Sequence, residues 1–258
     1  MGSLDGKIAI VTGASRRQGI GAAVCRLLAQ DGADIFFTHL STYDTNVALY
    51  EVDENWPDVF TGELQKLGIR AGHMELDISQ PDAPEKLLNK VEAAFGAPPT
   101  ILINNATYSV DADFRELSPA ILDEHCAVNV RGTCMMSAMF ARRIEGRHTG
   151  RIVNLVSGQD KGPQPGNLAY VATKGAISAF TRSLAAGLAE HGITVNAVDP
   201  GPTDTGWISD DLRAQLLPQF PLGRLGVPDD AARLIAFLAS EEARWITGQI
   251  IHSDGGFR

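Results

Sequence analysis

Short apolar runs, several of them rich in β-branched residues, alternate along this chain with longer segments whose apolar residues recur at helical spacing. Two of the runs, Ile8–Val11 and Ile101–Ile103, are apolar at every position, which is typical of strands buried on both faces of a parallel sheet. Alternating strands and helices predict a single-domain α/β fold, a doubly wound parallel sheet of the Rossmann type with about seven strands and helices on both faces. The expected strands are Ile8–Thr12, Asp34–Thr38, Ala71–Leu76, Thr100–Asn104, Arg151–Val156, Thr194–Val198 and Gln249–His252.

The length of the chain fits one domain. It has 258 residues, of which 44% are hydrophobic and 21% are charged. Single α/β domains commonly reach about 250 residues. Because no internal repeat or low-complexity tract divides the sequence, we predict one domain over residues 1–258.

The charge balance limits the classes of partner. The 31 Asp and Glu residues outnumber the 22 Lys and Arg residues, for a formal net charge of −9, and no dense basic run is present, so nucleic acid is not expected. The three cysteines lack CxxC spacing and the six histidines lack ligand spacing, so we expect reduced thiols and no metal site. The short, charged start and the brevity of Ile8–Val11 favour neither a targeting segment nor a membrane span. The expected location is the cytoplasm.

A glycine-rich stretch, Thr12–Gly21, follows the first expected strand and precedes a helical pattern. Glycines permit a tight turn and the close approach of a phosphate to the first amides of a helix, where the macrodipole favours negative charge. Such a turn is a weak signal in isolation. At the first strand-to-helix junction it indicates a dinucleotide site.

A second stretch, Ser157 to Lys174, suggests chemistry. It begins at the end of an expected strand, passes through a Gly/Pro-rich loop and enters a helical pattern that carries Tyr170 and Lys174 four residues apart. This spacing places both side chains on one helix face, and a nearby ammonium lowers a tyrosine pKa from about 10 by favouring the phenolate. Alone, the pair is more often an exposed helix face than a site. Downstream of a glycine loop, it predicts a proton donor.

Taken in order, these motifs resemble those of the short-chain dehydrogenase/reductase family along essentially the whole chain. Thr12–Gly21 resembles the glycine motif TGxxxGxG, with two additional residues between its first two glycines. Asn104-Asn105-Ala106 resembles the NNAG motif, with Thr107 in place of the last glycine. The C-terminal signature is matched by Ile246-Thr247-Gly248-Gln249 and Asp254-Gly255-Gly256.

The resemblance implies a set of site residues. Catalytic roles fall on Asn129, Ser157, Tyr170 and Lys174. Ser157 would orient a carbonyl, Tyr170 would protonate its oxygen, Lys174 would hold the nicotinamide ribose, and Asn129 would complete a proton relay through a helix carbonyl and a water. Contacts to the cofactor fall on Gly13, Ser15, Arg16, Arg17, Gly19, Ile20, Asp77, Ile78, Asn105, Ala106, Tyr170, Lys174, Pro200, Gly201 and Thr203.

The choice of nicotinamide cofactor depends on the end of the second strand. An acid there would bind a ribose 2′-hydroxyl and repel a 2′-phosphate. The stretch Thr38–Ser41 holds no acid, and the nearest one, Asp44, lies further along. Arg16 and Arg17 lie in the glycine loop, where family members that use NADPH often carry a basic residue. We therefore favour NADP(H) over NAD(H), the alternative being that both arginines are solvated loop charges.

Two connections, 41–55 and 201–228, are longer than this architecture needs. Because loops that follow strand carboxyl ends line the ligand crevice, we expect 201–228, with its helical pattern at Asp210–Leu217, to be a substrate lid. Its stretches Thr205–Ile208 and Leu216–Phe220 suggest apolar pocket walls. Polar contacts beside them would come from Gln159, Asp160 and Asn167.

The expected function is hydride transfer between NADP(H) and a carbonyl or secondary alcohol. The stretch Gly223–Pro228 resembles the 3-oxoacyl-carrier-protein reductases, so a 3-oxoacyl thioester is one candidate substrate. The alternatives are a free sugar, polyol, alcohol or small ketone, and a non-catalytic NADP-binding sensor. Carrier proteins are acidic, and a chain of net charge −9 would repel one unless a local basic patch forms from Arg142, Arg143 and Arg147.

Two long helical patterns, Ile121–Ile144 and Leu168–Leu188, exceed what cofactor binding requires. Relatives in the family pair these helices between subunits. We therefore expect a homo-oligomer, with a homotetramer as the favoured form.

Overall fold

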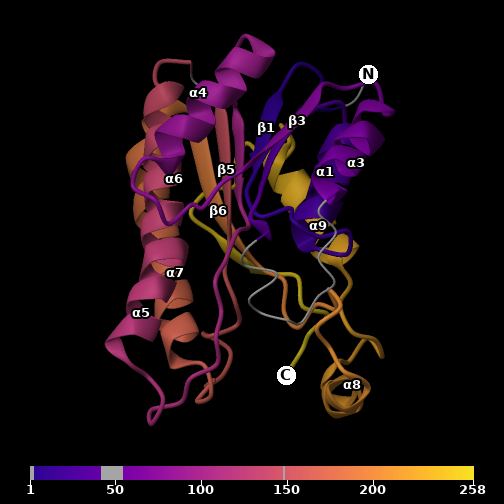
Figure 1. Ribbon diagram of the computed structural model, residues 1–258, viewed down its shortest axis with the longest axis vertical. Coiled ribbons are helices and arrows are strands. Elements are labelled where there is room, and N and C mark those ends of the chain that lie inside the picture. Colours follow the sequence, from indigo (N-terminus) through magenta and orange to yellow (C-terminus); the bar gives the residue numbers. More distant parts are fainter. Residues whose placement is uncertain (1–2, 42–54, 148) are drawn as a thin grey trace.

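A computed structural model describes residues 3–41, 55–147 and 149–258, and within these ranges the chain forms one sheet of seven strands, all parallel to their neighbours. The strand order is β3-β2-β1-β4-β5-β6-β7 (Figure 1). The chain reverses its direction of travel across the sheet between β3 and β4, so the carboxyl ends of β1 and β4 flank a switch point where α/β sheets bind ligands. The strands are β1 (Ile8–Val11), β2 (Asp34–His39), β3 (Ala71–Glu75), β4 (Ile101–Asn104), β5 (Gly150–Leu155), β6 (Ile193–Asp199) and β7 (Ile250–His252).

Helices cover both faces of the sheet. Figure 1 shows α4, α5, α6 and α7 on one side and α1, α3 and α9 on the other. The described helices are α1 (Ile20–Gln30), α3 (Trp56–Gln65), α4 (Ala83–Phe95), α5 (Pro119–His125), α6 (Thr133–Arg143), α7 (Leu168–Leu188), α8 (Asp210–Leu216) and α9 (Pro228–Ala239). Shorter helical turns are the π-helix Cys126–Gly132 and the 3-10 turns Ala189–His191 and Leu217–Gln219.

Successive side chains of β1 and β2 point to opposite faces of the sheet, so their apolar residues pack into two separate cores. Val11 and Phe37 pack into the core under α1, α3 and α9, whereas Ile10 and Phe36 pack into the core under α4, α6 and α7. All four are at most 1% exposed. Because complete burial of such a side chain contributes about 1.5–3 kcal/mol, burial on both faces fixes these central strands. The loops at the strand ends depend on this rigid sheet for their positions.

The predicted sheet is confirmed, and every strand begins and ends within one residue of its expected bounds. The predicted helix 121–144 differs, because α5 and α6 are separated by the π-helix Cys126–Gly132. Most of the predicted loop 41–55 lies outside the described residues. Among the described helices, none has the length and apolar character needed to cross a membrane.

Candidate active site

The glycine loop joins β1 to α1 through close packing against the loop that follows β4. Gly13 has a φ of +73°, and a Cβ on it would lie 2.6 Å from the Cα of Ala106. Asn105 Nδ2 donates to the carbonyl oxygens of Thr12 and Gly13 at 2.9 and 2.8 Å. A Cβ on Gly21 would in turn lie 2.7 Å from that Nδ2. The predicted residues Gly13, Asn105 and Ala106 therefore meet at the switch point.

The two additional residues of the glycine loop lie before the helix. The amide of Gly19 donates to the carbonyl of Arg16 at 3.1 Å, which closes a turn, and α1 begins at Ile20. Gly19 is extended, no side chain caps the helix, and no acid lies in its first turn. The first amides of a helix lack intrahelical acceptors, so this helix start suits an anion.

Arg17, expected at the cofactor, lies against α3. Its guanidinium carbon is 4.6 Å from the centroid of the Trp56 ring, and its Nη1 donates to Glu63 at 3.1 Å. The Trp56 indole donates to the carbonyl of Ala14 at 3.2 Å, which ties the loop to the same helix. Glu63 therefore already balances the charge of Arg17, and a phosphate would have to replace that carboxylate.

The end of β2 is tied to the glycine loop by two hydroxyl groups. Thr38 Oγ1 accepts from the amide of Gly13 at 3.2 Å, and Ser15 Oγ accepts from the amide of Leu40 at 3.1 Å. Asp44, the nearest acid by sequence, lies outside the described residues. His39 packs toward β3, where its Nε2 lies 3.1 Å from His73 Nδ1. Burial and the neighbouring His73 lower the pKa of His39.

Asp77 and Ile78, expected at the adenine, follow β3 and pack against the π-helix. Asp77 accepts from the amide of Ser79 at 2.9 Å, and Arg131 donates to the carbonyl of Ser79 at 2.6 Å. A Cβ on Gly132 would lie 2.9 Å from the carbonyl oxygen of Ile78. The loop after β3 is therefore fixed to the helical segment that also carries Asn129.

Lys174 links the expected catalytic residues. It is 4% exposed, its Nζ donates to the carbonyl of Leu155 at 2.8 Å, and that atom lies 5.4 Å from the centroid of the Tyr170 ring. Leu155 ends β5, and Ser157 follows two residues later. Burial lowers the pKa of Lys174 to about 8. The end of β5 and the start of α7 thus bring Ser157, Tyr170 and Lys174 into one region.

Asn129 lies in the π-helix and is 2% exposed. Its Nδ2 donates to Thr173 Oγ1 at 3.0 Å, so it contacts α7 between Tyr170 and Lys174. Its Oδ1 accepts from the amide of Tyr108 at 2.8 Å and from Thr107 Oγ1 at 3.1 Å. Thr107, which departs from the family motif, therefore supplies a hydrogen bond to Asn129. π-Helical turns occur frequently at functional sites.

The segment after β6 folds against the end of the chain. Gly201, with a φ of +60°, donates its amide to Asp199 Oδ1 at 2.9 Å. Thr203 Oγ1 donates to the carbonyl of Pro200 at 3.0 Å. Beyond this turn the expected lid forms a small apolar cluster with the end of the chain, consisting of Ile208, Leu212, Leu216, Phe220, Leu225 and Phe257.

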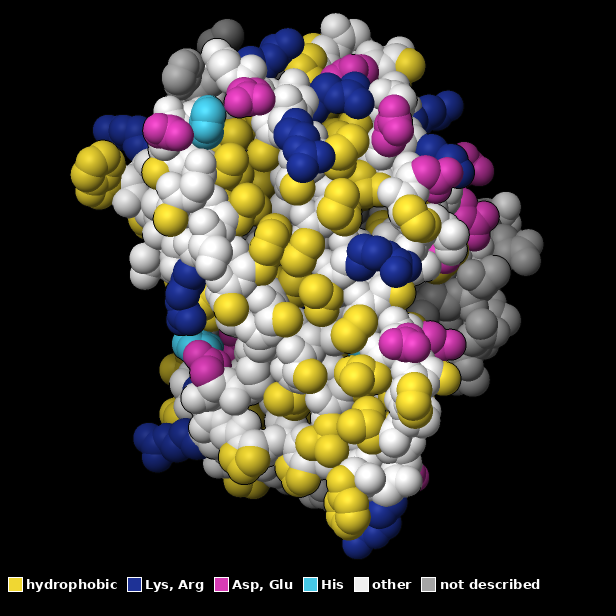
Figure 2. Space-filling model, turned by 90° about the vertical axis from the view of Figure 1, so that its left-hand side faces the viewer, with side chains coloured by type: hydrophobic (Ala, Val, Ile, Leu, Met, Phe, Trp, Pro, Cys, Tyr) yellow, Lys and Arg dark blue, Asp and Glu magenta, His cyan; other side chains and the backbone are white. Residues whose placement is uncertain are grey.

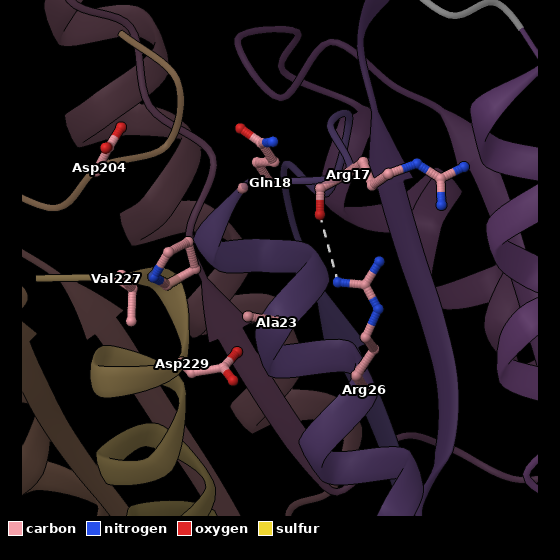
Figure 3. Close-up of a pocket in the computed structure, with 9 residues that line it drawn as sticks. Arg17, Gln18, Ala23, Arg26, Asp204, Val227 and Asp229 are labelled. Carbon is pink, nitrogen blue, oxygen red and sulfur yellow. Dashed lines mark hydrogen bonds between the residues drawn. The ribbon is translucent and has the colours of Figure 1, made fainter. Parts of the chain in front are cut away.

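A hollow of about 330 Å³ lies between the starts of α1 and α9 (Figure 3). The glycine loop and Asp204 of segment 201–228 both border it, so these two parts of the expected site are neighbours. Arg26 donates to the carbonyl of Arg17 at 3.3 Å beside it. The lining residues are Arg17, Gln18, Gly19, Ala23, Arg26, Asp204, Val227, Pro228 and Asp229.

The polar residues expected to contact substrate each contact another protein group as well. Gln159 Nε2 donates to Ser178 Oγ at 3.1 Å, and Asn167 Nδ2 donates to Asp111 at 2.9 Å. Asp160 lies 3.5 Å from His252 Nε2. The Oε1 atom of Gln159 and the Oδ1 atom of Asn167 are buried and accept no hydrogen bond from the described residues, so both oxygens stay candidates for contact with a ligand.

Several residues at the site were not singled out for it from the sequence. Thr173 contacts Asn129, and Lys161 forms an ion pair with Asp254. His252 Nδ1 lies 2.8 Å from Asp199 Oδ2. Of these residues, only Asp254 had a sequence signal, because it belongs to the C-terminal signature. The contacts themselves join segments that are distant along the chain, so no local pattern indicates them.

The comparisons with known proteins agree with this geometry. A family profile described as enoyl-(acyl carrier protein) reductase matches residues 13–258. The chain belongs to the short-chain dehydrogenase/reductase family, and it is an oxidoreductase of that family.

Relatives and solved structures cover almost the whole chain. The uncharacterized oxidoreductase YjdA of Bacillus subtilis (strain 168) is 52% identical, with 97% of this chain and 96% of that protein aligned. The 3-oxoacyl-[acyl-carrier-protein] reductase FabG of Escherichia coli (strain K12) is 35% identical, with 98% of each aligned. A blue fluorescent protein from a metagenomic library, solved in complex with NADPH, has a TM-score of 0.87, 33% identity and 99% coverage of both chains. Acetoin dehydrogenase YohF from Salmonella typhimurium has a TM-score of 0.83, 33% identity and 97% coverage of both chains.

Proposed function

We propose that this protein transfers hydride between NADP(H) and a carbonyl or secondary alcohol. The observation that carries the proposal is the buried Lys174, whose ammonium lies next to the Tyr170 ring and against the end of β5, two residues before Ser157. A proton donor, a charge that supports it and a hydroxyl group that can orient a carbonyl are the groups that such a reaction needs.

The residues around the α1 start suit the phosphates of a dinucleotide. The uncapped helix start provides amides for a pyrophosphate, and the first turn holds no acid that would repel it. We propose that Gly13, Ser15, Arg16, Arg17, Gly19, Ile20, Asp77, Ile78, Asn105, Ala106, Pro200, Gly201 and Thr203 hold the cofactor, together with Tyr170 and Lys174. When bound, the cofactor supplies or accepts the hydride.

The proposed catalytic roles are those that the family resemblance implies, and the contacts of Lys174 and Asn129 support them. Ser157 donates a hydrogen bond to the substrate oxygen, and Tyr170 gives that oxygen its proton as negative charge develops there. Lys174 supports the tyrosine with its charge and binds the ribose hydroxyls. Asn129 fixes the loop after β4 and its own turn of helix against α7, which keeps a relay to Lys174 in place.

NADP(H) is proposed over NAD(H) for two reasons. Leu40 and Ser41, the described residues directly after β2, include no acid that would repel a 2′-phosphate, and two arginines lie in the glycine loop. The NADPH complex of the metagenomic fluorescent protein supports this choice. A 2′-phosphate would have to replace Glu63 at Arg17, so we propose that Arg17 contributes less to binding it than an arginine with no such exchange would.

The charges around the site favour a free carbonyl compound over a carrier-bound thioester. Every basic residue in the connections after β4, β5 and β6 forms an ion pair, and the pairs are Arg115–Asp113, Lys161–Asp254, Arg213–Asp204 and Arg224–Asp230. Further acids, such as Asp111 and Asp210, lie in the same connections. An acidic carrier protein would therefore meet a negative edge.

The three arginines that could have formed a basic patch for a carrier protein lie elsewhere. Arg142 and Arg143 end α6, and Arg147 precedes the amino end of β5, so all three lie at the opposite end of the strands from Ser157. Arg143 also pairs with Glu92 at 2.8 Å. These positions support a free alcohol, sugar, polyol or small ketone as substrate, while a 3-oxoacyl thioester stays the second candidate.

A substrate panel tests the proposal. Purified protein is assayed with NADPH and NADH against acetoin, larger hydroxyketones, sugars, acetoacetyl-CoA and an acetoacetyl carrier protein. We expect NADPH-dependent reduction of at least one free ketone, with carrier-protein substrate turned over more slowly. Absence of turnover with every carbonyl, and of cofactor reduction with the matching alcohols, would contradict the proposed function, whereas preferred use of the carrier protein would contradict only the substrate choice.

We also propose a homo-oligomer. Figure 2 shows hydrophobic side chains gathered along the middle of the face formed by α4 to α7. Leu122 and Met135, on α5 and α6, are 36% and 41% exposed. An exposed apolar face of this kind is typical of a surface that binds another protein, and a second copy of the chain is the proposed partner.

A further inference from the structure

The last residues of the chain contact three segments of the proposed active site. The tail, Ser253–Arg258, follows β7 and lies near residues 157–161, here called the serine loop. It also lies against Gly201 and against the lid segment, residues 204–222. Figure 1 places the C-terminus close to α8 of that segment.

Lys161 joins the tail to the serine loop. Its Nζ forms an ion pair with Asp254 and donates to the carbonyl of Phe257 at 2.5 Å. Its own amide donates to the carbonyl of Gly158 at 2.9 Å, so the lysine closes a turn that begins beside Ser157. The contact therefore connects the residue after the catalytic serine with the end of the chain.

The tail packs closely against Gly201 and the lid segment. A Cβ on Gly201 would lie 2.5 Å from the Cβ of Asp254, which leaves no room for a side chain there. The rings of Phe257 and Phe220 have centroids 4.9 Å apart, and the amide of Arg258 donates to the carbonyl of Gln219 at 3.2 Å. Lid movement must therefore move the tail.

The Asp254 carboxylate requires a cation, and Lys161 provides it. Asp254 is 7% exposed, and a buried carboxylate is stable only when it is paired and hydrogen-bonded. Asp199, His252 and Asp254 bring ligand atoms within 4.8 Å of one another, a spacing that a metal ion could also use. Because the lysine ammonium already binds Asp254, the geometry favours the protein's own cation.

We propose that Lys161 is a positioning residue: its pair with Asp254 holds the tail in place, and the tail holds the lid segment against the serine loop. This inference rests on the proposed function, since that function gives Ser157 and the lid their roles. Loss of the pair should loosen the lid and let the serine loop shift, while Tyr170 and Lys174 keep their places on α7.

Tryptophan fluorescence can report on the lid without a substrate. Trp207 lies in the lid segment, is 40% exposed and donates to the carbonyl of Thr203 at 2.8 Å. Trp56 is buried at 2% exposure, and Trp245 is 95% exposed. In a Trp245→Phe background, quenching by acrylamide therefore reports mainly on Trp207.

In that background we compare Lys161→Ala, Lys161→Arg and Asp254→Asn. We expect the quenching constant of Trp207 to rise at least about twofold in the alanine and asparagine variants, because the lid opens more often. Their kcat/KM should fall roughly tenfold to a hundredfold through misplacement of reacting groups. Lys161→Arg should restore most of both values, because it retains the charge.

The matched control is Lys86→Ala, which removes an exposed lysine–aspartate pair on α4, where Lys86 lies 2.8 Å from Asp82. Quenching in Lys161→Ala equal to that of this control would overturn the proposal, even if activity fell. If Lys161→Ala does not fold, Phe257→Ala tests the same tail–lid contact, and unchanged quenching there would overturn it equally. Failure of the substrate panel would affect the proposed function alone, because quenching needs no turnover.

Discussion

At the residue scale, the candidate site consists of side chains whose surroundings limit what each can do. Lys174 is buried and donates to the carbonyl of Leu155, so its ammonium is held in a fixed place near Tyr170. Asn129 uses both ends of its amide on neighbouring segments. Such groups cannot move freely, which is the preorganisation that proton transfer needs.

Tyr170→Phe removes the proposed proton donor and little volume. We expect kcat to fall by roughly a hundredfold or more, because general acid catalysis contributes about 10²–10⁴-fold. Cofactor affinity should change little by comparison. Steady-state kinetics with NADPH, together with titration of cofactor fluorescence, measure the two effects. Full turnover by this variant would show the proposed mechanism to be wrong.

Arg16→Ala and Arg17→Ala separate the two glycine-loop cations. We expect Arg16→Ala to weaken NADPH binding about tenfold or more, since a hydrogen bond to a charged group contributes about 1.5–3 kcal/mol. Arg17→Ala should have an effect below that of a full charged hydrogen bond, because a phosphate must first replace Glu63. NADH affinity is the internal control. If neither variant, nor the double variant, changes the ratio of the two affinities, the cofactor argument fails.

Lys174 should give stability an unusual pH dependence. Its pKa is lowered by burial to about 8 in the folded protein, from an ordinary value of 10.5, so the unfolded chain binds more protons between these pH values. The lysine therefore destabilises the fold below about pH 8 and ceases to do so above about pH 10.5, a change of roughly 3 kcal/mol.

Urea unfolding of the wild type and Lys174→Met between pH 7 and 10 measures this effect, because other titrating groups cancel in the difference. We expect the stability of the wild type relative to Lys174→Met to rise with pH. A difference that stays constant across this range would indicate that the lysine is not buried as described.

At the scale of elements, the site depends on close contacts between connections that are far apart in sequence. The glycine loop packs on the loop after β4, and the loop after β3 packs on the π-helix. These contacts use backbone atoms at glycine positions, so a single added carbon must move a whole segment. Strand ends and helix starts thus position each other.

Gly13→Ala tests the first of these contacts. Gly13 has a φ of +73°, and an added Cβ would lie only 2.6 Å from the Cα of Ala106. We therefore expect the variant to lose about 1–3 kcal/mol of stability and to bind the cofactor more weakly. Gly62→Ala is the control, because it lies within α3 with nothing within 4 Å and should gain about 0.5–1 kcal/mol. Thermal or urea unfolding measures both, and equal stability of the two variants would contradict the packing described.

At the scale of the whole molecule, the proposed site lies at the carboxyl edge of the sheet, and apolar side chains are exposed on the helices that cover one face. The acidic connections at that edge and the apolar face over α4 to α7 are properties of the assembled fold. They suggest which substrates reach the site and which surface joins subunits.

Oligomerisation can be measured directly. For a chain of 27.6 kDa, a tetramer has a mass of about 110 kDa, four times the chain mass. We expect light scattering to give this value and Met135→Glu to lower it, because a charge would be buried at the proposed interface. A surface variant on the opposite face of the sheet, Lys66→Ala at the end of α3, should keep the full mass. A wild-type mass of a monomer would contradict the proposal.

Local sequence patterns were sufficient to predict the α/β class and the strand bounds to within a residue, and they supplied the residues of the proposed site. Local patterns are sufficient here because the spacing of apolar residues along a short segment indicates whether it forms a buried strand or one face of a helix. Only the tertiary structure revealed the engagement of Arg17 by Glu63, the π-helix around Asn129, the distance of Arg142 and Arg143 from the site, and the Lys161–Asp254 pair. Those features arise from contacts between segments separated by tens of residues, whose geometry no local pattern specifies.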